Sequence, residues 1–147
     1  MFTIFADHHQ FCLFDDDVCP PFPEDITELD LQRRFKAAPN LVAVYTDEES
    51  EFEVAIEFSG STPPIEYSAW AHIVEGPLNL PSGRVVLASP SSHLISCPRV
   101  EVLPGQYRVR VSAPIPAGGT HNRYLVNLWP SQDASIAVLK SAGQYAA

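Results

Sequence analysis

Long apolar segments and paired cysteines are missing from this 147-residue sequence. No apolar run approaches the ~18–20 residues that a membrane-spanning helix requires. The first residues lack both a basic stretch and a long apolar core, so we expect no signal peptide. The three cysteines, Cys12, Cys19 and Cys97, include no C-x-x-C pair, which argues against a disulfide framework or structural zinc and favours a reducing compartment. We therefore expect a cytoplasmic protein that does not contact a membrane.

Basic residues are also scarce. Nine Lys and Arg stand against 18 Asp and Glu, for a net charge of −9. Residues 1–57 hold 14 of those carboxylates and three basic residues, whereas residues 58–147 have a net charge of +2. A surface this acidic repels phosphate groups, so we expect no direct binding of nucleic acid. It favours a basic protein partner instead.

Sequence signatures of enzymes are absent. There is no G-x-S-x-G, H-E-x-x-H, P-loop or G-x-G-x-x-G motif. His8 and His9 are adjacent, but neighbouring residues of a strand point to opposite faces and cannot converge on one ion. Three further histidines are isolated in the sequence: His72, His93 and His121. We therefore expect a non-catalytic protein without a cofactor or a metal.

Most of the chain shows the alternation of apolar and polar residues that is typical of half-buried strands. In residues 52–58, Phe52, Val54, Ile56 and Phe58 are predicted to face the core. Residues 107–111 repeat the pattern with arginines facing water. Similar segments at 2–6, 10–14, 41–46, 70–74, 84–88, 99–103, 124–129 and 135–139 are separated by Gly- and Pro-rich turns such as 60–64 and 116–119.

The spacing of these segments predicts an all-β protein. Its expected fold is an antiparallel β-sandwich of about eight to ten strands, forming a single domain over residues 1–147. One short helix is predicted to be inserted at residues 27–38. Thr27 is a suitable N-cap with Asp30 three residues later, and Leu31, Phe35 and Ala38 would share its apolar face until Pro39 ends it.

Two groups of carboxylates are candidates for a functional surface. Asp15, Asp16 and Asp17 follow a predicted strand and could form a solvated loop, a calcium site, a catalytic carboxylate or a partner surface. The spacing of an EF-hand is missing, so calcium is disfavoured. If both loops lie at one end of the sandwich, the predicted contacts with a partner are Asp15, Asp16, Asp17, Asp47, Glu48 and Glu49.

Aromatic residues leave a second function open. Trp70 and Trp129 could stack on a sugar, although aromatic residues in strands usually belong to the core. A module that binds carbohydrate or a small ligand requires at least one of them to be exposed. A third alternative is a hydrolase whose carboxylate site has no local signature, which requires a pocket with two convergent carboxylates.

The opening of the chain, Ala6-Asp7-His8-His9-Gln10-Phe11-Cys12-Leu13-Phe14-Asp15, resembles that of the competence protein J family. His9, Gln10 and Phe11 match the family's His-Gln-Phe block, and residues 104–109 resemble its late Gly-x-Tyr hairpin. His8 departs from the family, which has an aromatic residue there. Because the family includes inhibitors of a DNA-entry nuclease, the resemblance implies a protein-binding role, as an inhibitor or immunity-type partner of a nuclease.

Overall fold

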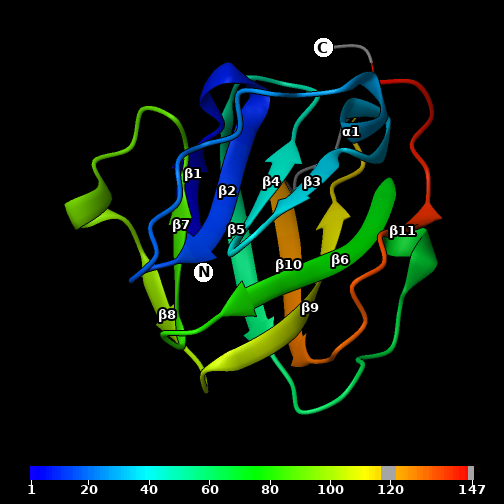
Figure 1. The fold of residues 1–147 in the computed structure, drawn as a ribbon. Coiled ribbons are helices and arrows are strands. Elements are labelled where there is room, and N and C mark those ends of the chain that lie inside the picture. The colour runs from blue at the N-terminus through cyan, green and yellow to red at the C-terminus, as the bar shows by residue number, and fades with distance from the viewer. Residues whose placement is uncertain (117–121, 146–147) are drawn as a thin grey trace.

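The computed structural model describes residues 1–116 and 122–145, and its strands form two sheets packed face to face (Figure 1). The larger sheet has the strand order β1 (Phe2–Phe5), β5 (Glu51–Phe58), β10 (Arg123–Pro130), β9 (Gly105–Ala113), β6 (His72–Leu80) and β11 (Ala137–Lys140). The smaller sheet has the order β3 (Phe35–Ala38), β4 (Leu41–Tyr45), β2 (Gln10–Asp15), β7 (Arg84–Ala88) and β8 (Arg99–Glu101). The predicted β-sandwich is confirmed.

The core between the sheets follows from the alternation in the sequence. Phe52 and Val54 of β5 are buried while Glu51 and Glu53 are exposed, as predicted. They belong to one apolar cluster with inward residues of the small sheet, among them Phe11 and Leu13. Phe58, the last residue of β5, departs from the prediction: it is 47% exposed.

The sheets differ from the predicted fold in two respects. The described residues contain eleven strands, and β5 pairs with β10 in parallel, with Glu53 beside Arg123. The other strand pairs recorded in this part of the chain are antiparallel. A parallel pair requires a long connection, and here the connection contains β6 to β9. The predicted turn at 116–119 lies, except for Pro116, outside the described residues, as does His121.

The predicted helix is correct at its start and wrong in its second half. Thr27 and Asp30 form the expected capping box, but α1 covers only Glu28–Arg33. Arg34 then adopts a left-handed conformation (φ 58°) that turns the chain, and Phe35–Ala38 forms β3 along β4. Pairing with β4 and complete burial of Phe35 in the core stabilise the strand more than another helical turn would.

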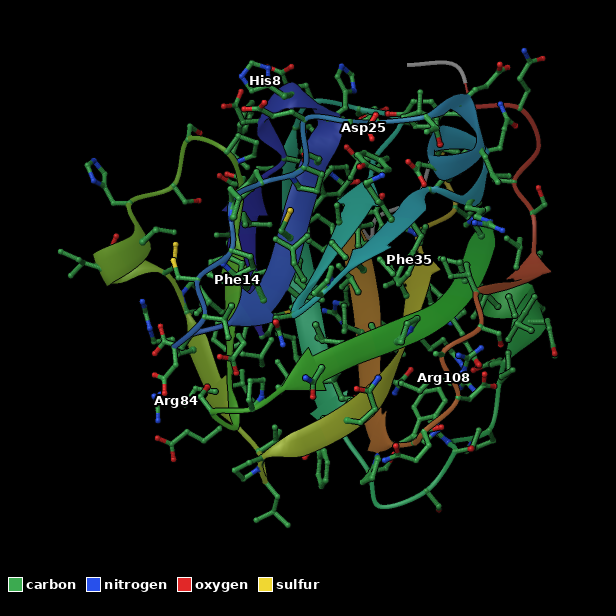
Figure 2. The ribbon with its side chains drawn as sticks, viewed as in Figure 1. His8, Phe14, Asp25, Phe35, Arg84 and Arg108 are labelled. Carbon is green, nitrogen blue, oxygen red and sulfur yellow. The ribbon has the colours of Figure 1, made fainter. Side chains whose placement is uncertain are left out.

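The small sheet is covered on its outer face as well. Every residue of β2 is buried. A second apolar cluster on this face includes Cys12, Phe14 and Tyr45, and it is covered by Phe22 and Tyr145 from outside the sheet. The segment from residue 16 to α1 therefore lies across the sheet and leads to the end of the molecule where Figure 2 labels Asp25. In residues 1–116 and 122–145, no helix is long and apolar enough to cross a membrane.

Candidate functional site

The two predicted acidic loops lie at opposite ends of β2. Gln10 pairs with Tyr45 and Phe14 with Leu41, so Asp15 leaves β2 at one end while the chain passes from β4 to Asp47 at the other. Six residues of strand separate these ends by roughly 20 Å. The assumption that both loops share one end is therefore wrong, because antiparallel strands exit a sheet on opposite sides.

Asp15 is a structural carboxylate. It is 0% exposed and accepts hydrogen bonds from the backbone N and Oγ of Ser82 (2.9 and 2.7 Å). It also accepts from the backbone N–H groups of Val18 (3.0 Å) and Asp17 (3.1 Å). Burial alone would raise the pKa of Asp15, but these bonds outweigh it and hold the pKa below its ordinary value. The prediction that Asp15 contacts a partner is contradicted by its burial.

Asp16 and Asp17 are paired with arginines of the small sheet. Arg84 Nε lies 3.2 Å from Asp16 and its Nη2 lies 2.5 Å from Asp17. Arg99 Nε lies 3.1 Å from the other oxygen of Asp16. These pairs balance the negative charge locally. A partner contact through Asp16 and Asp17 stays a prediction.

The other loop belongs to a larger group of carboxylates, which we call the acidic end. Asp47, Glu48 and Glu49 are exposed where the chain passes from β4 to β5. The first turn of the chain adjoins them, because Thr46 N donates to His9 O (2.8 Å) and Ala6 N donates to Ser50 O (2.8 Å). Figure 2 places His8 and Asp25 at this same end. The acidic end comprises Asp7, Asp25, Asp47, Glu48, Glu49 and Glu51.

Arg34 is a buried residue that holds the loop of the acidic end in place. Its buried guanidinium donates to the carboxylate of Asp47 and lies 5.3 Å from the centre of the Tyr145 ring. Tyr145 in turn donates its hydroxyl to Thr46 O (2.6 Å), and burial together with Asp47 raises the pKa of Tyr145 to about 12. The carboxylate of Asp47 is therefore held in place by Arg34. The side chain of Glu48 has no ion-pair partner in the described part of the chain and faces solvent.

A cavity of about 320 Å³ opens beside this loop. Its lining includes the charged residues Arg34, Asp47 and Glu48 and the aromatic residues Phe52 and Tyr124. Tyr124 is held edge-to-face between Phe11 (5.2 Å between ring centres) and Phe52 (5.1 Å). The acidic end therefore combines exposed carboxylates with aromatic rings that are held in place by packing. This arrangement is suited to binding a cationic side chain.

The residues of the family motif hold this end together. His8 and His9 both have left-handed backbone conformations (φ 54° and 58°) that turn the chain into β2. Gln10 is buried beside Tyr45, and Phe11 is part of the core. His9 Nε2 lies 3.9 Å from Glu49. The sequence did not predict this turn, because neither residue is a glycine.

The outer face of the large sheet carries a second polar group, which the sequence did not predict. Glu75 accepts from Arg108 Nε (2.9 Å) and from Arg110 Nε (2.8 Å). Both arginines were predicted to face water, but the chain around Pro63 and Ser135 covers them. Trp129 is only 3% exposed, with Arg110 over its ring at 5.1 Å.

This face bears on two other functions that the sequence left open, a carbohydrate-binding module and a hydrolase with a carboxylate site. Trp129 offers no platform for a sugar, whereas Trp70 is partly exposed and lines a cavity. Glu57 and Glu66 line the same cavity. Among the described residues, no group of three His, Cys, Asp or Glu side chains could hold a metal ion.

Comparison with known proteins gives similarity at the level of the fold. No family model matches the sequence, and no curated protein matches it. A solved structure of ComJ from Bacillus subtilis, described as an inhibitor of the DNA degrading activity of NucA, superposes with a TM-score of 0.72 at 15% identity, over 88% of this chain and 94% of that one. A second structure, described as crocagin biosynthetic gene J, gives 0.62 at 20% identity over 89% and 96%. The chain therefore has a ComJ-like fold, as the resemblance to the competence protein J family predicted.

Proposed function

We propose that this chain is a non-catalytic protein-binding domain that inhibits a basic nuclease through its acidic end. The observation that carries the proposal is the exposure of Asp47, Glu48 and Glu49 at the end of the sandwich where Figure 2 also labels His8 and Asp25. Arg34 is buried and paired, so it offsets only part of this charge. The ComJ-like fold supports an inhibitory role, because ComJ is described as an inhibitor of a DNA-degrading activity.

The mechanism is electrostatic competition. A nuclease presents Lys and Arg to phosphate groups, and a surface of carboxylates can occupy the same cleft. Complementary charge accelerates association by ~10–10³-fold, and close charge pairs across an interface couple by roughly 1.5–7 kcal/mol. Glu48 and Glu49 are suited to this role because their side chains are long and project from a loop that Arg34 and Tyr145 anchor.

The state of the cysteines supports a reducing location for this encounter. All three lie in described residues and have free thiols: Cys12 is buried, Cys97 is half-buried and Cys19 is exposed. An exposed free thiol persists most readily where disulfides do not form. We therefore place the proposed inhibitor in the cytoplasm.

The test compares two charge reversals of equal size. The partner is captured from a native lysate at low salt and retained only if it degrades DNA. Its affinity is then measured by calorimetry with the wild-type chain, Glu48→Lys/Glu49→Lys and the matched control Asp16→Lys/Asp17→Lys. We expect the first variant to bind about 100-fold more weakly, about 2.7 kcal/mol, and the control to change by less than about threefold.

Two outcomes would contradict the proposal. Full inhibition by Glu48→Lys/Glu49→Lys would remove the acidic end from the mechanism. A larger loss in the Asp16/Asp17 control, with its thermal stability intact, would move the contact to the opposite end. Added salt should weaken the wild-type complex and affect the Glu48/Glu49 variant much less.

A further inference from the structure

A cavity of about 360 Å³ lies on the outer face of the large sheet. Its floor comes from three neighbouring strands, because Asn127 of β10 pairs with both Glu57 of β5 and Arg110 of β9, and Ser112 follows two residues later. Its wall comes from the segment between β5 and β6, including Pro63 and Trp70. Side chains on adjacent strands lie within about 5 Å of one another, so the floor is a continuous polar row.

Arg110 makes this floor rigid. Its Nε donates to Glu75 (2.8 Å), and its Nη1 donates to the carbonyl oxygens of Pro63 (3.0 Å) and Pro64 (3.2 Å). The guanidinium also stacks over Trp129. These contacts occupy Nε and Nη1 of Arg110 and tie the wall of the cavity to the sheet, so the site is preorganised.

Two side chains of the floor have unused hydrogen-bonding capacity. Ser112 is 2% exposed and Asn127 is 6% exposed, and both line the cavity. No side-chain hydrogen bond of either residue is recorded within 1–116 or 122–145, and because both line the cavity their polar atoms can bond to a molecule that enters it. An amide and a hydroxyl both donate and accept, which suits ligand groups that also do both.

From this arrangement we propose that the cavity binds a small, uncharged, polyhydroxylated molecule such as a monosaccharide. Ligand hydroxyls would bond to Asn127, Ser112 and the exposed carboxylate of Glu57, while the apolar face of the sugar ring packs on Trp70. Glu57 and Glu66 disfavour an anion. The volume is at the lower end of the range for ligand sites, which fits one small molecule. The proposal does not rest on nuclease inhibition.

The test is a titration of the ¹⁵N-labelled full chain with glucose, galactose, mannose and N-acetylglucosamine, followed by NMR. The reporters are the indole N–H of Trp70 and the side-chain amide of Asn127. We expect at least one sugar to shift both signals along one saturable curve with a dissociation constant in the millimolar range. The side-chain amide of Asn79, which is exposed and lies outside the cavity, serves as an internal reference.

Paired variants make the result specific. Trp70→Ala and Asn127→Ala should each weaken binding by about tenfold. Tyr67→Ala and Asn79→Ala remove an exposed aromatic residue and an exposed amide outside the cavity, and both should bind like wild type. Thermal unfolding checks each variant, and Ser112→Ala provides a smaller change if either of the first two fails to fold.

Three outcomes would overturn the proposal: no saturable shift with any of the four sugars, unchanged affinity in folded Trp70→Ala, or binding of an amine probe such as spermidine in place of the sugars. Trp70→Ala should keep its nuclease inhibition, so failure at this cavity can be told apart from failure at the acidic end.

Discussion

The two acidic loops have the same formal charge and opposite environments. In the Asp15-Asp16-Asp17 loop, Asp15 is hydrogen-bonded to Ser82, and Arg84 and Arg99 form ion pairs with Asp16 and Asp17. Asp47-Glu48-Glu49 meets one buried arginine, Arg34, and leaves two carboxylates in solvent. Negative charge in a sequence is therefore not the same as negative charge presented to a partner.

The difference arises from strand pairing. Asp15 pairs with Val85, so the turn before β7 and the arginine that opens it lie directly beside the end of β2. Arg99 reaches the same place from β8, which pairs with β7. At the other end, the neighbours are the first turn of the chain and the segment that leads into α1, both of which carry carboxylates of their own.

The largest expected effect is on stability and separates the two loops. Asp15→Ala removes an acceptor from three backbone N–H groups and the hydroxyl of Ser82, so it should lower the free energy of unfolding by about 3 kcal/mol. Glu48→Ala should change it by less than about 0.5 kcal/mol. Urea unfolding measures both values, and equal effects would contradict the structural role of Asp15.

A smaller effect follows from the pKa of Asp15, which lies below the ordinary value of 3.8. The folded state holds this carboxylate ionised, so its contribution is complete above the unfolded pKa and is lost as the pH falls through the folded one. The difference in melting temperature between wild type and Asp15→Asn should therefore be constant near neutral pH and shrink below pH 3.8. A difference in melting temperature that grows on acidification would contradict a lowered pKa of Asp15 in the folded state.

The smallest effect is expected at Asp17. Its side chain is largely exposed, and Arg84 keeps Asp16 as a second partner if Asp17 is neutralised. Asp17→Asn should change the free energy of unfolding by at most about 0.5 kcal/mol. A loss above about 1.5 kcal/mol would show that the three aspartates act as one unit, with Asp15 unable to hold the turn alone.

The sequence predicted features that depend on local pattern. The alternation in residues 52–58 identified β5, and Thr27 with Asp30 identified the start of α1. Local pattern failed after Arg33, because Arg34 adopts a left-handed conformation without the glycine or asparagine that usually signals one. Phe35 then joins the core through β4, a contact that helix propensity does not contain.

The candidate sites were less accessible to sequence reasoning than the fold. Asp47, Glu48 and Glu49 were correctly placed in an exposed loop, but the end of the sandwich at which they lie depends on pairing across the sheet. Arg108 and Arg110 alternate like solvent-facing residues, and only the chain that covers them makes them buried. Asn127 and Ser112 meet on adjacent strands, and nothing in either segment alone marks them.

The parallel pairing of β5 with β10 sets an order of assembly. β5 can join the large sheet only after β10 has been synthesised, because β10 lies between β5 and β9. β1 pairs with β5, so it also joins the large sheet only after β10 has been synthesised. Such distant pairings close late and slow folding, so β1 and β5 join the large sheet only once the last quarter of the chain has been synthesised. Residues 1–57, which include both strands except for the last residue of β5, hold 14 carboxylates and three basic residues, and such a surplus of like charge opposes aggregation of the segment.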